Sequence, residues 1–214
     1  MTTNQFTECP NCGAKIKEGL FSSVNMLNKI EIQFIKEFIP EAKSDYYCNK
    51  CGNKLLAEAK ESVEIEKSKI RSRLQIILPS IPVISTHSPV NWDYEVIVMV
   101  TGQSTTGTGV FSEFSSSFTD LFGAQSGSYN RKLKAGEDLC FSQLRIQAID
   151  SGANAVIATD IDYSEVGGEK GMLMVCMAGT AVRLKNTNII GSERAKLLDE
   201  ITELNKRIKY LMKG

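Results

Sequence analysis

The sequence has few of the residues from which catalytic centres are commonly built. Its 214 residues include a single histidine and a single tryptophan. A Ser-His-Asp triad would have to use His87, which lies in a proline-rich stretch, and we interpret it as a surface residue. Basic and acidic residues number 25 each, so the overall charge gives no attraction to nucleic acid or to a membrane surface.

Long hydrophobic runs are also missing. The two most apolar stretches, "LQIILPSIPVI" and "GMLMVCMAGTAV", are shorter than the roughly 20 residues that cross a bilayer. The N-terminus has neither the basic start nor the apolar run of a secretory signal. We therefore expect a soluble, cytoplasmic protein without a membrane partner. Because the cytosol is reducing, its six cysteines are expected to be metal ligands or free thiols rather than disulfides.

The phosphate-binding motifs of nucleotide sites are absent too. The stretch "VTGQSTTGTG" carries Gly102 and Gly107 at the spacing of a Walker A loop. Thr108, however, stands where the lysine is required, and Gly109 where the metal-binding hydroxyl is required. No GxGxxG motif opens a helix here either. We therefore expect that no nucleotide binds at this stretch and that it contains no catalytic residues.

Two matched cysteine pairs are the strongest chemical signal. "CPNCG" begins at Cys9 and "CNKCG" begins at Cys48, and each pair is followed by glycine. Two such turns facing each other place four thiolates around a tetrahedral ion, the preferred environment of Zn²⁺. The predicted metal ligands are Cys9, Cys12, Cys48 and Cys51. The zinc would be structural, because four thiolates leave no open position for water.

These turns resemble the knuckles of zinc ribbons, with one departure. The gap between the pairs is longer than the roughly 15–20 residues of a simple ribbon. It contains apolar residues at helical spacing, and a helix there would supply the module with a core: Leu27, Ile30, Phe34, Ile35 and Phe38. The alternatives are a redox dithiol, which usually has one pair rather than two, and a chance repetition of the motif.

The pattern predicts four regions. Residues 1–54 form the zinc-ribbon-like module, and residues 55–93 a connecting helix followed by a proline-rich linker or extended arm. Residues 94–185 form an α+β domain in which a strand, a loop with one long helix, and two further strands follow in order. The long helix is expected to place Leu133, Cys140, Leu144 and Ala148 on one face and to end at Ser151-Gly152, with the glycine as a left-handed cap. Residues 191–213 form an amphipathic helix with Ser192 as its expected N-terminal cap. Its apolar seam fits either a short coiled coil or packing on its own domain.

Three blocks of the α+β region resemble the YbjQ-like heavy-metal-binding domain family. They are "VTGQSTTGTGVFSEFSSSFTDLFGAQSGSYNRKL", "GANAVIATDIDYSEVGG" and "GMLMVCMAGTAV", which occur in the family's order between Tyr94 and Leu184. Gln125 departs from the pattern, because a basic residue is expected before Ser126. The resemblance implies a dodecin-like α+β subunit that assembles as a homo-oligomeric ring, with a pentamer as the expected size. It implies no reaction.

A second metal site would have to use residues of the last two strands. Met172, Met174 and Cys176 alternate along one strand and would suit a soft ion such as Cu(I). Asp160 and Asp162 share a face of the preceding strand and would suit a hard cation. Methionine and cysteine also fill cores, and the aspartates fit a solvated face. We therefore interpret both sets first as structural.

The function expected from these patterns is that of a non-catalytic, zinc-binding oligomer acting as a scaffold or binding protein. Its ring would display several zinc modules, through which a protein partner could bind by avidity. One alternative is a zinc-ribbon adaptor that binds nucleic acid or protein, although the module has no continuous basic stripe. The other is an enzyme whose site forms between subunits.

Overall fold

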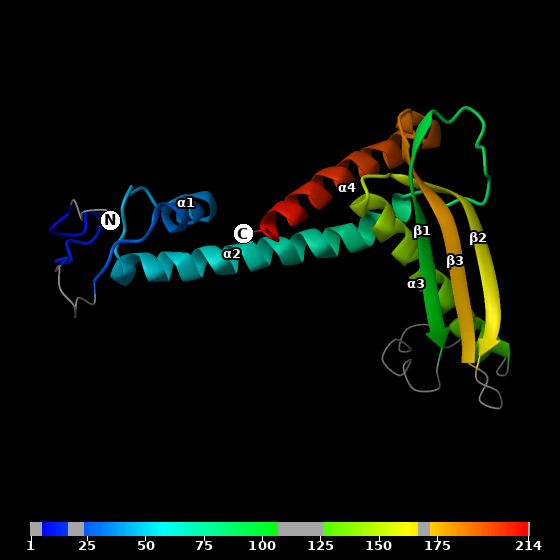
Figure 1. Ribbon diagram of the computed structural model, residues 1–214, viewed down its shortest axis with the longest axis horizontal. Coiled ribbons are helices and arrows are strands. Elements are labelled where there is room, and N and C mark those ends of the chain that lie inside the picture. Colours follow the sequence, from blue (N-terminus) through cyan, green and yellow to red (C-terminus); the bar gives the residue numbers. More distant parts are fainter. Residues whose placement is uncertain (1–5, 17–23, 107–125, 167–171, 214) are drawn as a thin grey trace. The chain divides into compact units, whose positions relative to one another are not determined.

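The structure, a computed structural model, divides the chain into two compact units, Met1–Arg71 and Ser72–Gly214 (Figure 1). The boundary falls inside α2 (Asn49–Ile77), which begins in the first unit and ends in the second. Each unit is described separately. The residues that the structure describes are 6–16, 24–106, 126–166 and 172–213.

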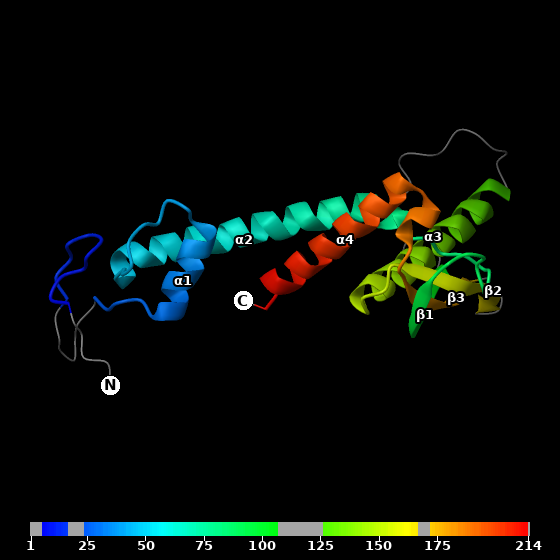
Figure 2. The ribbon, with the colours of Figure 1, turned by 90° about the horizontal axis from the view of Figure 1, so that it is seen from above.

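In the first unit, α1 (Lys29–Phe38) packs against the first turns of α2 (Figure 2). The helix begins at a capping box, in which Asn28 accepts a hydrogen bond from the Glu31 N–H and Glu31 accepts one from the Asn28 N–H. The helix predicted in the insert is therefore present. Ile35 is buried as expected, but Ile32 is buried where the spacing favoured Ile30, which is 80% exposed.

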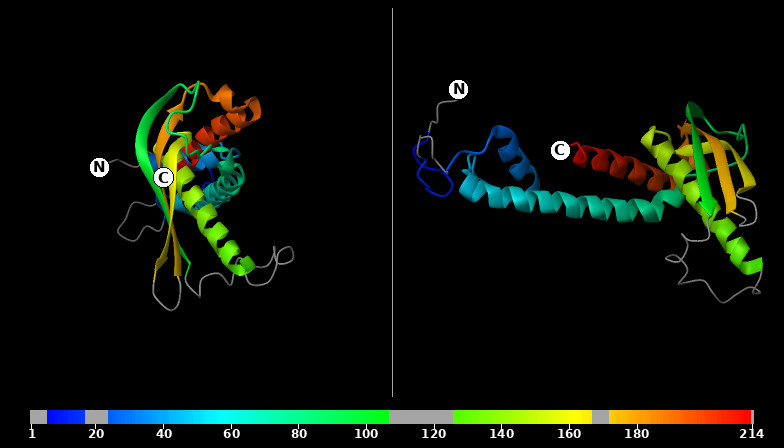
Figure 3. Two further views of the ribbon diagram at one scale, coloured as in Figure 1. Left: turned by 90° about the vertical axis from the view of Figure 1, so that its right-hand side faces the viewer. Right: turned by 60° about the horizontal axis from the view of Figure 1, so that its bottom comes forward.

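The second unit has the predicted α+β fold, in which one long helix covers a three-stranded antiparallel sheet (Figure 3). The strand order is β1-β3-β2, so β3 is central and the other two strands are edges. The chain order of strand, helix, strand, strand matches the prediction. The bounds are β1 (Tyr94–Thr106), α3 (Ser126–Asp150), β2 (Ala155–Val166) and β3 (Met172–Leu184).

The core of this unit lies between α3 and one face of the sheet. Cys140, Leu144 and Ala148 are fully buried on the helix face that the spacing predicted, and they pack with Val100 and Val175. α3 ends as expected before Gly152, whose φ of +83° is left-handed.

Close approach of α3 to β1 depends on Gly102. A Cβ at that position would lie 2.7 Å from the carbonyl oxygen of Cys140. The Gly/Thr-rich stretch therefore begins inside strand β1 and not in a loop, and its glycine at position 102 serves helix–sheet packing. Gly107 to Gly109, together with Gln125, lie outside the described residues.

The outward edge of β1 is covered by two glutamine side chains from α3. The Gln147 amide accepts from the Thr101 N–H and donates to the Thr101 carbonyl. The Gln143 amide does the same for Gln103, with N···O distances of 2.8 and 3.2 Å. Because these backbone groups are satisfied, this part of the edge cannot pair with another strand.

The proline-rich segment is an extended arm along β2. After the short helix η1 (Leu78–Ser80), Val83 forms a parallel bridge with Val156. The Ile84 N–H donates to the Val156 carbonyl at 3.0 Å, and the Val156 N–H donates to the Pro82 carbonyl at 2.9 Å. His87 follows on this arm and is exposed, as expected for a surface residue.

The C-terminal helix, α4 (Ser192–Leu211), follows the short helix η3 (Thr187–Ile190). Its Leu198 and Ile201 pack with Ile77 and Ile81 in the second unit. Glu200 also accepts two hydrogen bonds from Arg73, at 2.6 and 2.8 Å. The first half of the apolar seam of α4 thus packs within its own unit. Of the two predictions made from the sequence, this agrees with packing on its own domain and not with a short coiled coil. The residue that caps the helix is Gly191, not Ser192.

None of the helices in the described ranges combines the length and hydropathy needed to span a bilayer.

Candidate metal centre

The first cysteine pair lies in a tight hairpin turn. Glu8 and Lys15 form an antiparallel bridge, and the Cys9 N–H donates to the Ala14 carbonyl at 2.8 Å. The Gly13 N–H donates to the Cys9 carbonyl at 2.8 Å, and Gly13 has a left-handed φ of +69°. The glycine after this pair therefore allows the chain to fold back, as the sequence predicted.

The second cysteine pair differs from the expected turn, because it opens helix α2. The Gly52 N–H donates to the Cys48 carbonyl at 2.7 Å as part of the first helical turn. Gly52 is not among the described glycines with positive φ. A Cβ there would overlap the Leu27 side chain and lie 3.1 Å from the Cβ of Tyr47. This glycine thus serves close packing rather than chain reversal, which corrects the prediction of two equivalent turns.

A backbone ladder fixes the second pair to the chain that precedes α1. Met26 and Cys48 form an antiparallel bridge. The Leu27 N–H donates to the Tyr47 carbonyl at 2.8 Å, and the Asn49 N–H donates to the Asn25 carbonyl at 2.7 Å. The long insert therefore returns beside Cys48 and holds it in place.

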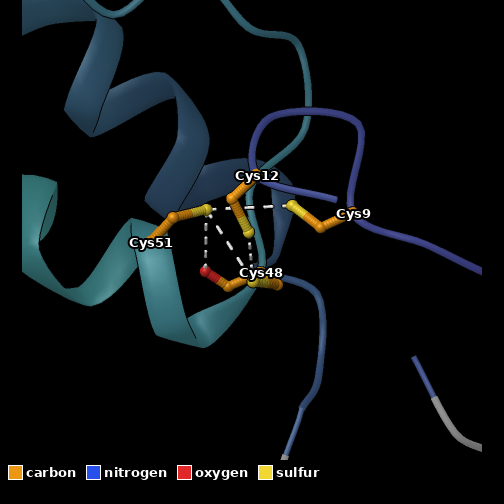
Figure 4. Close-up of side chains that lie close together, drawn as sticks. All are labelled: Cys9, Cys12, Cys48 and Cys51. Carbon is orange, nitrogen blue, oxygen red and sulfur yellow. Dashed lines mark hydrogen bonds between the residues drawn. The ribbon is translucent and has the colours of Figure 1, made fainter. Parts of the chain in front are cut away.

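The four cysteine sulfurs converge on one point (Figure 4). The Sγ–Sγ distances are 3.7 Å for Cys9–Cys51, 3.6 Å for Cys12–Cys48 and 3.7 Å for Cys48–Cys51. All four sulfurs lie within 4.8 Å of one another. A tetrahedral ion with metal–sulfur bonds of about 2.3 Å requires sulfur–sulfur edges of about 3.8 Å. The arrangement therefore has the size of a four-thiolate metal site.

Burial differs among the four sulfur ligands. Cys48 is fully buried and Cys9 is 3% exposed, and both belong to a small apolar cluster with Ile16 and Val24. Cys51 is half-buried, and Cys12 is exposed. One side of the cluster therefore faces solvent through Cys12.

Hydrogen bonds and neighbouring sulfurs shift the thiol pKa values in opposite directions. Burial disfavours the Cys9 thiolate, but backbone N–H groups, including those of Cys12 and Asn11, donate to its sulfur and lower its pKa to about 6. For Cys12 the Ala14 N–H lowers the pKa, but desolvation and the sulfurs of Cys48, Cys9 and Cys51 outweigh it and raise the pKa to about 12. Burial also raises the pKa of Cys51. Without a metal, Cys9 is thus a thiolate at neutral pH whereas Cys12 and Cys51 keep their protons, and a cation would stabilise the deprotonated forms of these two.

The other candidate ligands form no comparable cluster. Cys176 lies opposite Asp162 in the sheet register, and both share a face with Met174. Among the described residues, however, the four cysteines form the only group of three or more histidine, cysteine or acidic side chains that could hold an ion. The side chain of Met172 lies outside the described part of the chain.

The structure also shows one interaction that the sequence analysis did not identify. The side chain of Asn11, between Cys9 and Cys12, hydrogen-bonds to Cys51 in the other pair and lowers the pKa of that thiol against the effect of burial. The residue lies inside the CxxC spacer, which is the position from which a side chain can cross to the facing pair.

A similar solved structure is the crystal structure of a protein of unknown function from Pediococcus pentosaceus, which belongs to the DUF74 family. The identity is 18%, and the alignment covers 48% of this chain and 96% of that chain with a TM-score of 0.34.

The family comparison concerns the second unit. Residues 82–185 match the YbjQ-like family, which is described as "Putative heavy-metal-binding". The match includes the extended arm at residues 82–93 and excludes all four clustered cysteines. The family match thus covers residues 82–185, and the four-cysteine cluster lies before it in the chain.

Proposed function

We propose that the chain is a non-catalytic, zinc-stabilised binding protein in which Cys9, Cys12, Cys48 and Cys51 hold one structural Zn²⁺. The observation that carries the proposal is the match between the observed sulfur–sulfur distances, 3.6–3.7 Å, and the edge of a ZnS₄ tetrahedron. Disulfide-bonded sulfurs would lie about 2.0 Å apart.

The chemistry of the ligand set favours zinc in a structural role. Thiolates select soft or borderline ions, and a tetrahedral S₄ set is typical of zinc. All four ligands come from the protein, so no position is open for a substrate or a water. Cys9, Cys48 and Cys51 also contribute to the small core around Ile16 and Val24, so an ion would stabilise the fold of this module directly.

We further propose that the YbjQ-like domain assembles the chain into a homo-oligomeric ring. Its two edge strands carry exposed apolar side chains: Val96 and Met99 on β1 are 62% and 68% exposed, and Ile161 and Tyr163 on β2 are exposed as well. A contact between two different edges is head-to-tail, and such contacts generate rings when they close. Because Gln143 and Gln147 already cover part of β1, side-chain packing near Met99 would form this contact.

A ring would display several zinc modules, so a protein partner that binds one module weakly would bind the assembly by avidity. Apolar and aromatic side chains on the module surface support a protein partner. Ile30 and Tyr46 are exposed, and Phe6 and Tyr46 form a ring pair at 4.7 Å.

Native mass spectrometry with elemental analysis tests both parts of the proposal. We expect one zinc ion per chain in a closed ring, with a pentamer as the expected size. Cys48→Ser should lose the zinc, whereas the matched control Cys176→Ser should retain it. Met99→Asp should dissociate the ring without changing zinc content. A metal-free chain would contradict the zinc site, and a monomer would contradict the ring.

A further inference from the structure

We propose that Cys12 is an oxidation site within the four-cysteine cluster, and that Cys48 is the residue with which it forms a disulfide. A peroxide would react at Cys12, and formation of the Cys12–Cys48 disulfide would release the ion. This inference rests on the proposed zinc site, because metal binding keeps all four sulfurs as thiolates.

Access of an oxidant to the cluster is the first step. Cys12 is the exposed member, whereas Cys9 and Cys48 are buried and Cys51 is half-buried. Among thiolates of one metal site, the sulfur that a dissolved peroxide can reach reacts first. The attacked atom is therefore the Sγ of Cys12.

The distance to a second sulfur determines which residue completes the disulfide. The Sγ atoms of Cys12 and Cys48 are 3.6 Å apart and in contact. Cys9 lies 3.7 Å from Cys51, so the remaining two sulfurs are also adjacent. Each cysteine of the first turn thus has a sulfur of the second pair within 3.7 Å, and for Cys12 that sulfur belongs to Cys48.

The chemistry needs hydrogen peroxide as the oxidant. The Cys12 thiolate attacks one peroxide oxygen, the O–O bond breaks, and sulfenic acid and hydroxide form. The Cys48 thiolate then attacks the Cys12 sulfur, the S–O bond breaks, and a disulfide and a second hydroxide form. Two protons from solvent convert the hydroxides to water. One peroxide has then removed two electrons and two of the four metal ligands.

The remaining cysteines of the chain provide an internal comparison. Cys140 is fully buried and lies 3.4 Å from the Val175 carbonyl, to which its thiol donates. Burial raises its pKa, which disfavours the reactive thiolate. Cys176 is half-buried on the sheet. Neither should be oxidised before the cluster.

The test uses the full chain loaded with zinc and treated with increasing hydrogen peroxide. Zinc release is followed with a colorimetric indicator, and disulfides are located by mass spectrometry of peptides that have not been reduced. We expect about one zinc ion released per Cys12–Cys48 disulfide, and rebinding of zinc after treatment with dithiothreitol. Cys176→Ser should give the same curve.

Two outcomes would overturn the inference: a first disulfide that joins another pair, or zinc retained after Cys176 has been oxidised. The zinc content before treatment distinguishes failure of this inference from failure of the proposed function. A chain that holds no zinc contradicts the proposed function, whereas a chain that holds zinc but forms another first disulfide contradicts this inference alone.

Discussion

The two units of this chain differ in the apolar clusters that they bury. The first unit has small apolar clusters, one of which includes Cys9 and Cys48 themselves. The second has a larger core in which a long helix covers a sheet. A small module with little apolar area to bury usually needs a metal or disulfides, whereas a helix–sheet domain does not. The difference indicates that metal should control the order of one unit and not of the other.

Removal of one thiolate should produce the largest effect, because the first unit should lose its structure while the second unit keeps its own. Cys48→Ser is expected to abolish stoichiometric zinc binding and to unfold the first unit, because structural zinc contributes on the order of 10 kcal/mol in small modules. Hydrogen exchange should become fast in α1, while the sheet of the second unit keeps its protection. Cys176→Ser is the control. Loss of protection in both units would contradict the distinction.

Acidification should weaken zinc binding without affecting the second unit. Cys9 has a pKa of about 6, so it is already a thiolate at pH 7, while Cys12, with a pKa of about 12, must lose a proton to the metal. Below about pH 6 the Cys9 proton must also be displaced. Zinc affinity should therefore fall as pH falls, by a further factor of about ten per pH unit below 6. Competition with a chelator between pH 5 and 8 measures the zinc affinity. If the logarithm of that affinity changed with pH at the same slope above and below pH 6, the role given to the Cys9 proton would be contradicted.

A substitution in the core of the second unit should destabilise that unit and leave zinc binding unchanged. Gly102→Ala places a Cβ 2.7 Å from the Cys140 carbonyl oxygen, so α3 must shift from the sheet. We expect a loss of about 1–3 kcal/mol in the free energy of unfolding of this unit. Zinc content should stay at one per chain. Thr101→Ala, at the neighbouring exposed position, should change little, and denaturant unfolding followed with a zinc assay distinguishes the two.

The glutamines along β1 provide a smaller test of the same unit. Gln143→Ala with Gln147→Ala removes the hydrogen bonds to the backbones of Gln103 and Thr101. Water can replace these partners, so we expect a loss of only about 1–2 kcal/mol, together with increased self-association through the uncovered edge. Thermal unfolding and light scattering measure both effects. Ser142→Ala, on the same helix, is the control, and equal association of both variants would refute the protective role.

The smallest expected effect concerns Thr159. This residue is buried, and its Oγ1 has no hydrogen-bond partner among the described residues. Thr159→Val keeps the shape and removes the unsatisfied hydroxyl, so stability should stay within about 1 kcal/mol of the original or rise. Thr159→Ala, which leaves a cavity, should be less stable than the valine variant. A valine variant that unfolds more easily than the alanine variant would show that the hydroxyl has a partner.

Much of this architecture could be predicted from local patterns. The doubled CxxCG motif indicated that four cysteines cluster, and the helical spacing of Cys140, Leu144 and Ala148 predicted the buried face of α3. Alternating and β-branched residues predicted the strands. The helix face and the strands depend on residues close together in sequence. The cysteine cluster depends on a metal-binding chemistry in which four thiolates commonly surround one ion.

What could not be predicted depends on distant contacts. The second cysteine pair opens α2 because Gly52 packs against Leu27 and Tyr47, which no spacing within "CNKCG" reveals. Ile30 fits the apolar pattern of α1 but faces solvent, since the tertiary packing buries Ile32 beside the predicted Ile35. The left-handed Ala158, with a φ of +51°, lies at the irregularity between Ile157 and Asp160 where β2 shifts register against β3, and no local sequence preference indicates it.

X-ray absorption at the zinc edge of the purified full chain tests the central claim most directly. If the four sulfurs bind one ion, the spectrum should fit four sulfur neighbours at about 2.3 Å and no lighter ligand. A first shell that contains nitrogen or oxygen, or the absence of zinc after loading, would contradict the account.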